Sequence, residues 1–182
     1  MKTNFDEIIK NFKSAKLTFA GEDKEYFLTI KEDVVGDRLR LKYTLESGYD
    51  KVARVSLYHV INEEKGIKKW NSFGYKEVPD SMFEIDNFYV EPKFRNAGIG
   101  TAFFNIIMQN IVEFDKAQNH HSKLVFVRMD TPEATAFFNK WSAVENDRYI
   151  EEAQRTTRMI INEPRVVPAK TFIVTPISLE LQ

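Results

Sequence analysis

Cysteine is absent from the 182-residue sequence, which excludes disulfides, thiolate metal sites and cysteine nucleophiles. Long apolar runs are also missing, since no stretch approaches the roughly 18 residues of a membrane-spanning helix. The start of the chain is charged and lacks the apolar stretch of a signal peptide. We therefore expect no membrane partner, and we expect the cytoplasm as the compartment.

An excess of either charge is lacking as well. Lys and Arg number 26 against 27 Asp and Glu, for a net charge of −1. This balance gives no electrostatic basis for nucleic acid as the main partner. The adjacent His120 and His121 point apart in most backbones, and no third ligand is suggested, so we expect no metal site.

What is present is typical of a soluble globular protein, with 43% hydrophobic and 29% charged residues. The chain is long enough to bury a hydrophobic core without disulfides or bound metal ions, which predicts a single domain over residues 1–182. In its first part, apolar residues at helical spacing predict a helix over 4–16. Alternating patterns then predict antiparallel strands over 25–32, 37–47 and 51–61. The polar segment 62–81 follows and is expected to form a long excursion, a loop outside the sheet.

The second part alternates between strand and helix patterns. The expected elements are a strand over 82–90, a helix over 99–116, a buried strand over 123–129, a helix over 131–143, and closing strands over 155–161 and 170–181. The strand–helix–strand unit is long enough for a right-handed parallel crossover. The fold class is therefore α/β (α+β mixed), a mostly antiparallel sheet with a central parallel strand pair, flanked by helices.

Two of the seven glycines, Gly98 and Gly100, lie one residue apart in "VEPKFRNAGIGT", between a strand and the best helix. A helix N-terminus carries unpaired N–H groups and favours anions. Glycines let a phosphate approach those groups, and Arg95 can add charge-assisted contacts. The alternative is that both glycines serve an ordinary tight turn.

Two familiar phosphate-binding patterns do not fit this loop. The Walker pattern needs a lysine directly after its last glycine, and none follows Gly100. The dinucleotide pattern Gly-x-Gly-x-x-Gly has Phe103 in place of its third glycine. The pattern Arg95-x-x-Gly98-x-Gly100 after a strand instead resembles the acetyl-CoA loop of the GNAT superfamily of N-acetyltransferases.

The resemblance extends to a second motif. In that family, the helix after the neighbouring strand carries Ala, an aromatic pair and Lys, and "ATAFFNKW" matches at Ala134, Phe137, Phe138 and Lys140. The likeness covers roughly residues 82 to 145. It implies a parallel pair splayed around acetyl-CoA, which would be bound as a cosubstrate without metal. The cofactor-binding residues implied are Phe88, Tyr89, Val90, Arg95, Asn96, Ala97, Gly98, Ile99, Gly100 and Thr101.

The resemblance also divides the chain by role. Residues 1–81 would form the variable, strand-rich acceptor side, 82–145 the acetyl-CoA-binding core, and 146–182 the closing strands. The implied reaction is direct acetyl transfer to an amine of a small molecule or peptide. Acceptor identity and a homodimer are left open. An alternative is a GNAT-like acyl-CoA-binding module that is catalytically weak or inactive.

Two carboxylates are candidates for the base that accepts the amine's proton. Glu84 and Asp86 lie two residues apart on one strand, and so on one face. Glu84 matches the glutamate base of the histone-acetylating branch of the family. Many members protonate the leaving thiolate with a tyrosine, but Phe138 stands at that position. Tyr89 and Tyr149 are candidates to replace it.

Overall fold

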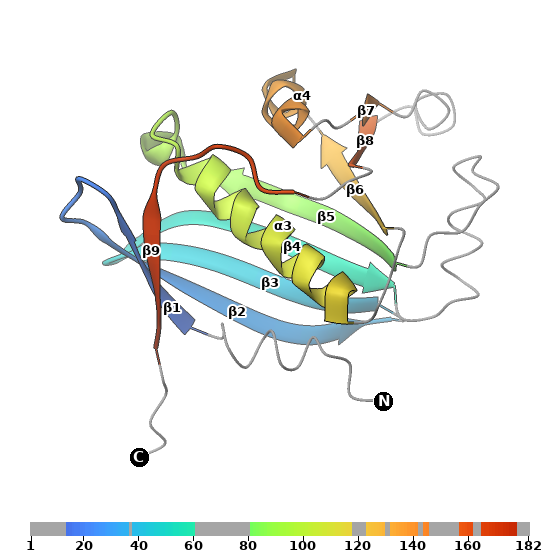
Figure 1. Ribbon diagram of the computed structural model, residues 1–182, viewed down its shortest axis with the longest axis horizontal. Coiled ribbons are helices and arrows are strands. Elements are labelled where there is room, and N and C mark those ends of the chain that lie inside the picture. Colours follow the sequence, from blue (N-terminus) through green and yellow to red (C-terminus); the bar gives the residue numbers. More distant parts are fainter. Residues whose placement is uncertain are drawn as a thin grey trace, which may run out of the picture.

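The computed structural model describes residues 14–36, 38–60, 81–117, 123–129, 132–141, 144–145, 157–161 and 165–177. Its elements run in the order β1 (Ser14–Phe19), β2 (Glu25–Val35), β3 (Arg38–Ser47), β4 (Asp50–Val60), β5 (Ser81–Val90), η1 (Pro92–Phe94), α3 (Ile99–Ala117), β6 (Lys123–Met129), α4 (Pro132–Phe138), η2 (Asn139–Trp141), β7 (Val144–Glu145), β8 (Thr157–Ile161) and β9 (Phe172–Pro176). Figure 1 shows this arrangement.

The strands of the described residues join into one nine-stranded sheet in the order β7-β8-β6-β5-β4-β3-β2-β1-β9. β5 and β6 pair in parallel, while the remaining pairings recorded in the described part are antiparallel. The expected fold class, a mixed and mostly antiparallel sheet flanked by helices, is confirmed.

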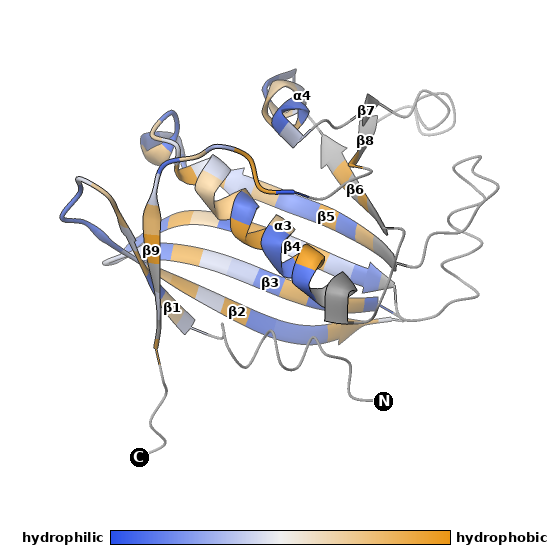
Figure 2. Cartoon of the chain, viewed as in Figure 1, coloured by the Kyte–Doolittle hydropathy of each residue, from blue (hydrophilic) through white to orange (hydrophobic). Residues whose placement is uncertain are grey.

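Alternation along the strands gives the sheet two different faces. In β3, the side chains of Leu39, Leu41, Tyr43 and Leu45 are buried, while their neighbours are half-buried or exposed. Period-two alternation places such residues on one face of a strand. Figure 2 shows hydrophobic and hydrophilic residues alternating along β2 to β5. One face of the sheet is therefore built for a core.

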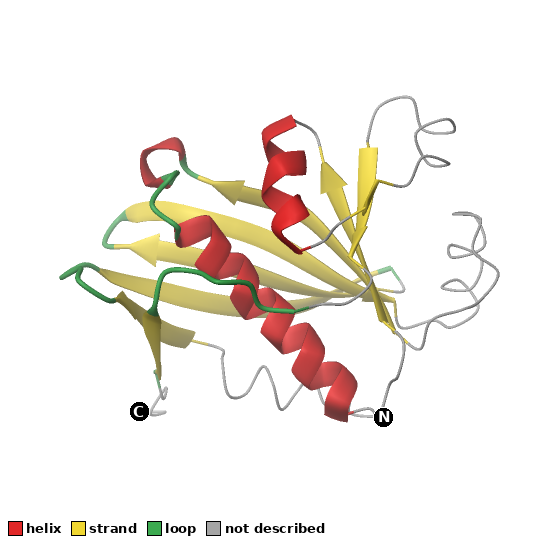
Figure 3. Cartoon of the chain, turned by 45° about the horizontal axis from the view of Figure 1, so that its top comes forward, coloured by secondary structure: helices red, strands yellow, loops and turns green. Residues whose placement is uncertain are grey.

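α3 covers this apolar face (Figure 3). Its broad apolar stripe is buried against the sheet, and the Nδ2 of Asn110 donates to the Tyr43 hydroxyl at 2.9 Å. The main-chain segment from Arg165 to Thr171 is tied to the same helix, because the Asn105 side chain bonds both the carbonyl and the N–H of Val167. No helix of the described residues is long and apolar enough to cross a membrane.

α4 and η2 continue the core beyond α3. The Phe104 ring lies 4.5 Å from that of Trp141 and 5.3 Å from that of Phe138, centroid to centroid. The indole N–H of Trp141 donates to the side-chain Oδ1 of Asn105 at 3.1 Å. α4 is thereby fixed beside the N-terminal half of α3, next to the glycine loop.

Several expected boundaries differ from the observed ones. The helix over 4–16 is wrong at residues 14–16, which begin β1, while residues 4–13 lie outside the described residues. Pairing with both β2 and β9 overrides the local helical pattern there. The helix over 131–143 is α4 followed by the short 3₁₀ helix η2. The excursion over 62–81 falls outside the described residues except for Ser81, which opens β5.

Candidate functional site

A cleft forms where β5 separates from β6. Parallel pairing runs from Ser81↔Lys123 to Ile85↔Val127. Beyond Ile85, β5 continues to pair with β4, whereas the end of β6 pairs with β8. The sheet edge of β5 that faces α4 is thus left without a strand partner in the described residues after Ile85, and its main-chain groups line the opening.

The separation coincides with a bulge in β5. Ser56 lies opposite Asp86, but Arg54 lies opposite Tyr89, so β5 holds one more residue than β4 over this interval. Asn87 absorbs the extra residue with a φ of 54°, in the left-handed region. The alternation is therefore interrupted, and Asp86 and Phe88 lie on opposite faces of the sheet.

The bulge interrupts the regular alternation of β5. Without it, two-residue spacing would put Phe88 and Val90 on the same face as Glu84 and Asp86. In the structure, Phe88 packs on the α3 face, where its ring lies 5.3 Å from that of Phe104. Glu84 and Asp86 lie on the other face, opposite Tyr58 and Ser56 of β4.

The loop after β5 has a backbone geometry that could cradle a phosphate. Asn96 and Gly98 both adopt positive φ, at 61° and 79°. The N–H of Ala102 bonds the Gly98 carbonyl at 3.1 Å, which closes the first turn of α3. The preceding N–H groups, up to that of Thr101, are those that a helix leaves without an internal partner. No acidic residue stands in the first turn of α3 to compete for them.

Gly100 lies in a closely packed position between β5 and α4. A Cβ at this position would come within 3.3 Å of Val90 Cγ2 and 3.5 Å of the Phe137 ring. An added Cβ would therefore require the Val90 side chain to shift by a few tenths of an ångström, while the contact of that Cβ with Phe137 would be ordinary. Gly98 has more room, since a Cβ there would meet Lys170 Cβ at 3.5 Å, but its positive φ disfavours any side chain.

Arg95 is anchored rather than free. Its Nε donates to the Val90 carbonyl at 2.8 Å, and its guanidinium carbon lies 5.2 Å from the centre of the Tyr89 ring. The remaining guanidinium N–H groups lie beside the loop, where they can reach an anion. Arg95 therefore links the end of β5 to the cradle.

The cleft between β5, the loop and α4 has a volume of about 860 Å³. Most of the residues expected at the site line it, namely Asp86, Phe88, Tyr89, Val90, Arg95, Asn96, Gly98, Gly100 and Thr101. Three others do not. Ala97 is exposed in the loop, and the Ile99 side chain is in the core. Glu84 lies outside the cleft, on the face of the sheet away from α3.

The two candidate carboxylates have different surroundings. Glu84 is 7% exposed, and its Oε2 lies 3.4 Å from Nη1 of Arg38. Asp86 is half-buried at the inner end of the cleft, and its Oδ1 accepts the N–H of Asn87 at 2.8 Å. The geometry therefore favours Asp86 as the carboxylate in reach of a reacting group in the cleft.

The α4 side of the cleft adds residues to which the sequence analysis gave no role. Lys140 donates from Nζ to the Thr101 hydroxyl at 3.1 Å and stands beside the loop. Glu133 of α4 also lines the cleft, and on the opposite side so does Asn87 of β5. The motif "ATAFFNKW" contains Lys140, and its position one helical turn after Phe137 was the available indication.

Phe138 is 2% exposed. Its ring contacts those of Phe88 and Phe137, at 5.8 Å and 5.2 Å between centroids. Among the described residues, no cluster of three His, Cys, Asp or Glu side chains could hold a metal ion. The site thus combines an apolar wall, a glycine loop at the N-terminus of a helix, and two carboxylates, Asp86 of β5 and Glu133 of α4.

Neither a family model nor a curated protein matches the chain. Solved structures do show similarity. Mutant forms of the spermidine/spermine N-acetyltransferase SpeG from Vibrio cholerae match with a TM-score of 0.42 and 17% identity, over 68% of this chain and 64% of that chain. FeeM, an N-acyl amino acid synthase from uncultured soil microbes, matches with a TM-score of 0.46 and 9% identity, over 69% and 68% of the two chains.

A third similar structure is a protein described as a streptothricin acetyltransferase from Bacillus anthracis str. Ames, in complex with acetyl coenzyme A. It matches with a TM-score of 0.38 and 13% identity, over 98% of this chain and 94% of that chain. The match to the Vibrio cholerae protein spans about 64% of that protein's length. All three matches have a TM-score below 0.5 and an identity below 20%, so no function is inferred from them.

Proposed function

We propose that the protein is an N-acetyltransferase that moves the acetyl group of acetyl-CoA directly to an amine. The observation that carries this proposal is the cleft at the β5–β6 separation. An anion-binding loop lies at one end of it and the Asp86 carboxylate lies at the other. A tight turn alone would not require this juxtaposition with a carboxylate and an unpaired strand edge.

The residues of the cleft fit the cofactor. The N–H groups at the start of α3, with Arg95 and Lys140, would hold the pyrophosphate. Gly98 and Gly100 keep side chains out of that space. The main-chain groups of β5 from Phe88 to Val90 lie at its open edge and would pair with the amides of the pantetheine arm.

The chemistry of the chain follows from these positions. When bound, acetyl-CoA supplies an acetyl group activated as a thioester. The Asp86 carboxylate accepts the proton that the amine loses as its nitrogen bonds to the acetyl carbon and the carbon–sulfur bond breaks. Phe138 has no proton to give to the departing thiolate. Tyr89 lines the cleft and could supply one, whereas the other candidate, Tyr149, lies outside the described residues.

A second function is favoured by one observation. Phe138 is buried among aromatic rings at the position where many relatives would place a proton-donating tyrosine. A module that binds acyl-CoA without turnover needs no proton donor there. Release of CoA in the presence of amines separates the two functions, because a binding module releases none.

The test of the proposal begins with calorimetric titration of acetyl-CoA. We expect micromolar binding to the wild type and loss of binding in Gly98→Trp, whose indole would fill the cradle. Gly36→Trp is the matched control, since Gly36 also has a positive φ, with no atom within 4 Å of an added Cβ. It should bind acetyl-CoA normally.

Turnover is measured by thiol-reactive detection of CoA with a panel of amines. Amine-dependent release that is lost in Asp86→Asn supports the transferase. Binding without release under any amine supports the binding module. A folded wild type that does not bind acetyl-CoA would overturn both and leave the two glycines as a turn.

A further inference from the structure

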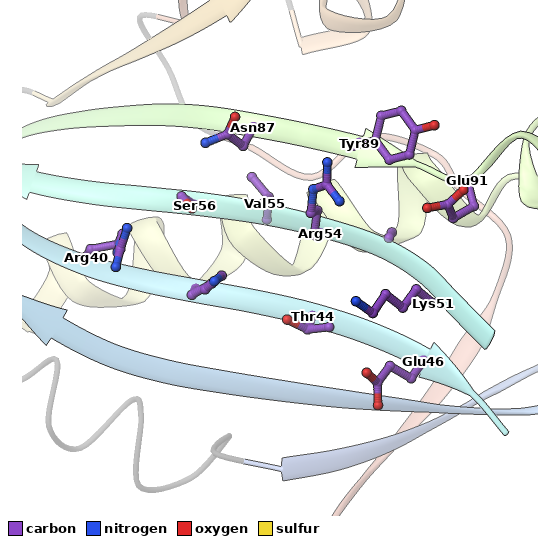
Figure 4. A pocket seen from close by; sticks show the side chains of 12 residues that line it. Arg40, Thr44, Glu46, Lys51, Arg54, Val55, Ser56, Asn87, Tyr89 and Glu91 are labelled. Atoms are coloured by element: carbon purple, nitrogen blue, oxygen red, sulfur yellow. The ribbon is translucent and has the colours of Figure 1, made fainter. Parts of the chain in front are cut away.

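A second concavity lies on the open face of the sheet, opposite α3. It is a groove of about 520 Å³ formed by β3, β4 and β5. Figure 4 shows the side chains of Arg40, Arg54 and Tyr89 on the side of the sheet away from α3, which passes behind the strands. Ala53 and Val55 line the groove from between these residues, and their side chains belong to the core. The lining residues are Arg40, Lys42, Thr44, Glu46, Lys51, Ala53, Arg54, Val55, Ser56, Asn87, Tyr89 and Glu91. We name this concavity the open-face groove.

The open-face groove is continuous with the cleft. Asn87 and Tyr89 line both, so the two spaces meet at the β5 bulge. Asp86, which lines the cleft, lies in register with Ser56 of the groove. A molecule that reaches Asp86 from the open face therefore passes along these strands.

Positive charge predominates in this groove. Four of its residues are basic, Arg40, Lys42, Lys51 and Arg54, and two are acidic, Glu46 and Glu91. The excess of two positive charges contrasts with a chain whose net charge is −1. The excess is therefore a property of this surface and not of the overall composition.

The basic residues differ in how they are engaged. Arg40 is held by Asp33, with Nε to Oδ1 at 2.7 Å and a second contact from Nη2 to Oδ2. The hydrogen bond between these two side chains lowers the pKa of Asp33 and raises the pKa of Arg40. No ion pair joins Lys42, Lys51 or Arg54 to an acid within the described part of the chain.

Arg54 is the cation nearest to the junction. Its guanidinium carbon lies 5.0 Å from the centre of the Tyr89 ring, and Figure 4 shows the two side chains next to each other. Stacking on an aromatic ring restrains the planar guanidinium and leaves its N–H edge available. Such an edge binds a carboxylate or a phosphate in a bidentate manner.

We propose that the acceptor amine carries an anionic group, a carboxylate or a phosphate, which Arg54 binds with the help of Lys51 and Lys42. This inference rests on the proposed acetyl transfer and names the substrate class of the same site. The amine end would then reach toward Asp86 at the bulge. A polyamine without an anion would meet like charge along the groove and be disfavoured.

Matched probe pairs test the proposal by binding alone. The pairs are phosphoethanolamine with ethanolamine and phenylalanine with phenethylamine, which separate phosphate from carboxylate. NMR titration of the full chain measures each affinity. We expect one or both anion-bearing members to bind at least about tenfold more tightly than their partners. Equal affinity within both pairs, tighter binding of the cationic members, or no binding of an anion-bearing probe would overturn the proposal.

Variants assign the preference to the groove. Arg54→Gln should reduce the advantage of the anion-bearing member about fivefold or more, and Lys51→Gln should reduce it less. Lys16→Gln, on β1 and paired with Glu25, is the control and should leave it unchanged. An unchanged preference in both groove variants would also overturn the proposal. If Arg54→Gln does not fold, an unchanged preference in Lys51→Gln alone would overturn it.

Failure of this inference is distinguishable from failure of the transferase proposal. Binding of anion-bearing probes without CoA release would contradict acetyl transfer and leave the anion preference standing. CoA release that is faster with spermidine than with the anion-bearing amines would support the transferase and overturn the anion preference.

Discussion

Asp86 and Phe88, two residues apart on β5, lie on opposite faces of the sheet. Asp86 is in register with Ser56, which lines the open-face groove, while the Phe88 ring packs against Phe103 and Phe104 of α3. Regular alternation would put both on one face. The inversion places a carboxylate on the open side of the cleft and an aromatic wall on the other.

The inversion depends on Asn87, whose φ is 54°. Asn87→Ala should lower the free energy of unfolding by about 1 kcal/mol, because a Cβ without a compensating polar group disfavours the left-handed region. Asn87→Gly should retain stability, since glycine adopts this region freely. Urea denaturation of both variants measures the difference. Equal losses in Ala and Gly would indicate that the Asn side chain, and not its backbone, holds the bulge.

Asp86 and Glu84 should respond differently to neutralisation. Asp86→Asn removes the proposed base and should lower kcat for CoA release by about 10² to 10⁴. Glu84→Gln breaks the contact with Arg38 and should lower stability by about 1 kcal/mol, since the pair is only partly buried. Its kcat should stay within a few-fold of the wild type.

Steady-state kinetics and melting curves on the same preparations separate these outcomes. The reverse pattern, with Glu84→Gln inactive and Asp86→Asn active, would assign the base to Glu84. The KM for acetyl-CoA should be unchanged in both variants, because neither carboxylate lies at the loop.

Much of this fold was predictable because its patterns are local. Hydrophobic spacing predicts the strand β5 and the apolar stripe of α3. The position of Gly98 and Gly100 directly before a helix predicts the loop between β5 and α3. The residue at which β5 bulges was not predictable, because nothing in "EIDNFYV" marks Asn87 as the one that takes a positive φ. That conformation is set by the register between β5 and β4.

Tertiary pairing explains the other differences. Residues 14–16 continue a helical pattern, yet β2 and β9 pair with them and enforce a strand. Lys140 gains its place at the loop only because α4 folds back beside α3, so its contact with Thr101 is invisible in the sequence. The open-face groove likewise combines residues of β3 and β4 with residues of β5, which is separated from them in the chain by residues 61–80.

Lys140 should strengthen binding of the cofactor through charge. Lys140→Gln should weaken acetyl-CoA binding about tenfold, the loss expected for one charge-assisted contact to phosphate. The loss should shrink as salt is raised, because this side chain is exposed. Calorimetry at two ionic strengths measures both effects, with Lys16→Gln as the control. A salt-independent loss would point to packing against Phe137 instead.

Asn105 should prove more important for stability than an ordinary polar residue. Its side chain makes three hydrogen bonds, to both main-chain groups of Val167 and to the Trp141 indole, and the residue is buried. Asn105→Ala should lower the free energy of unfolding by about 3 kcal/mol, because buried partners are left unpaired. It should also weaken acetyl-CoA binding, since Trp141 follows Lys140.

Gln109→Ala is the matched control on the same helix. Gln109 bonds Glu113 at the exposed surface, and its loss should change stability by less than about 0.5 kcal/mol. Chemical denaturation of the two variants compares them directly. Similar small losses would mean that solvent replaces the Asn105 contacts.

Tyr43 should make the fold sensitive to alkali. Burial raises its pKa, and the hydrogen bond donated by Asn110 opposes this rise only in part. Between the ordinary tyrosine pKa of about 10 and the raised value, the unfolded chain loses a proton that the native protein keeps. The stability contributed by the neutral hydroxyl is therefore full below about pH 10 and is lost as the pH rises further.

Tyr43→Phe isolates this effect. At neutral pH the variant should be less stable by about 1 kcal/mol, because the Asn110 amide loses its acceptor. Above about pH 10 the wild type should lose its advantage by up to about 1.4 kcal/mol per pH unit, the value for one proton. Tyr26, whose pKa burial also raises, is present in both proteins and cancels in the difference. Parallel stability curves for the two proteins between neutral and alkaline pH would show that the Tyr43 hydroxyl ionises as readily in the native state as in the unfolded chain.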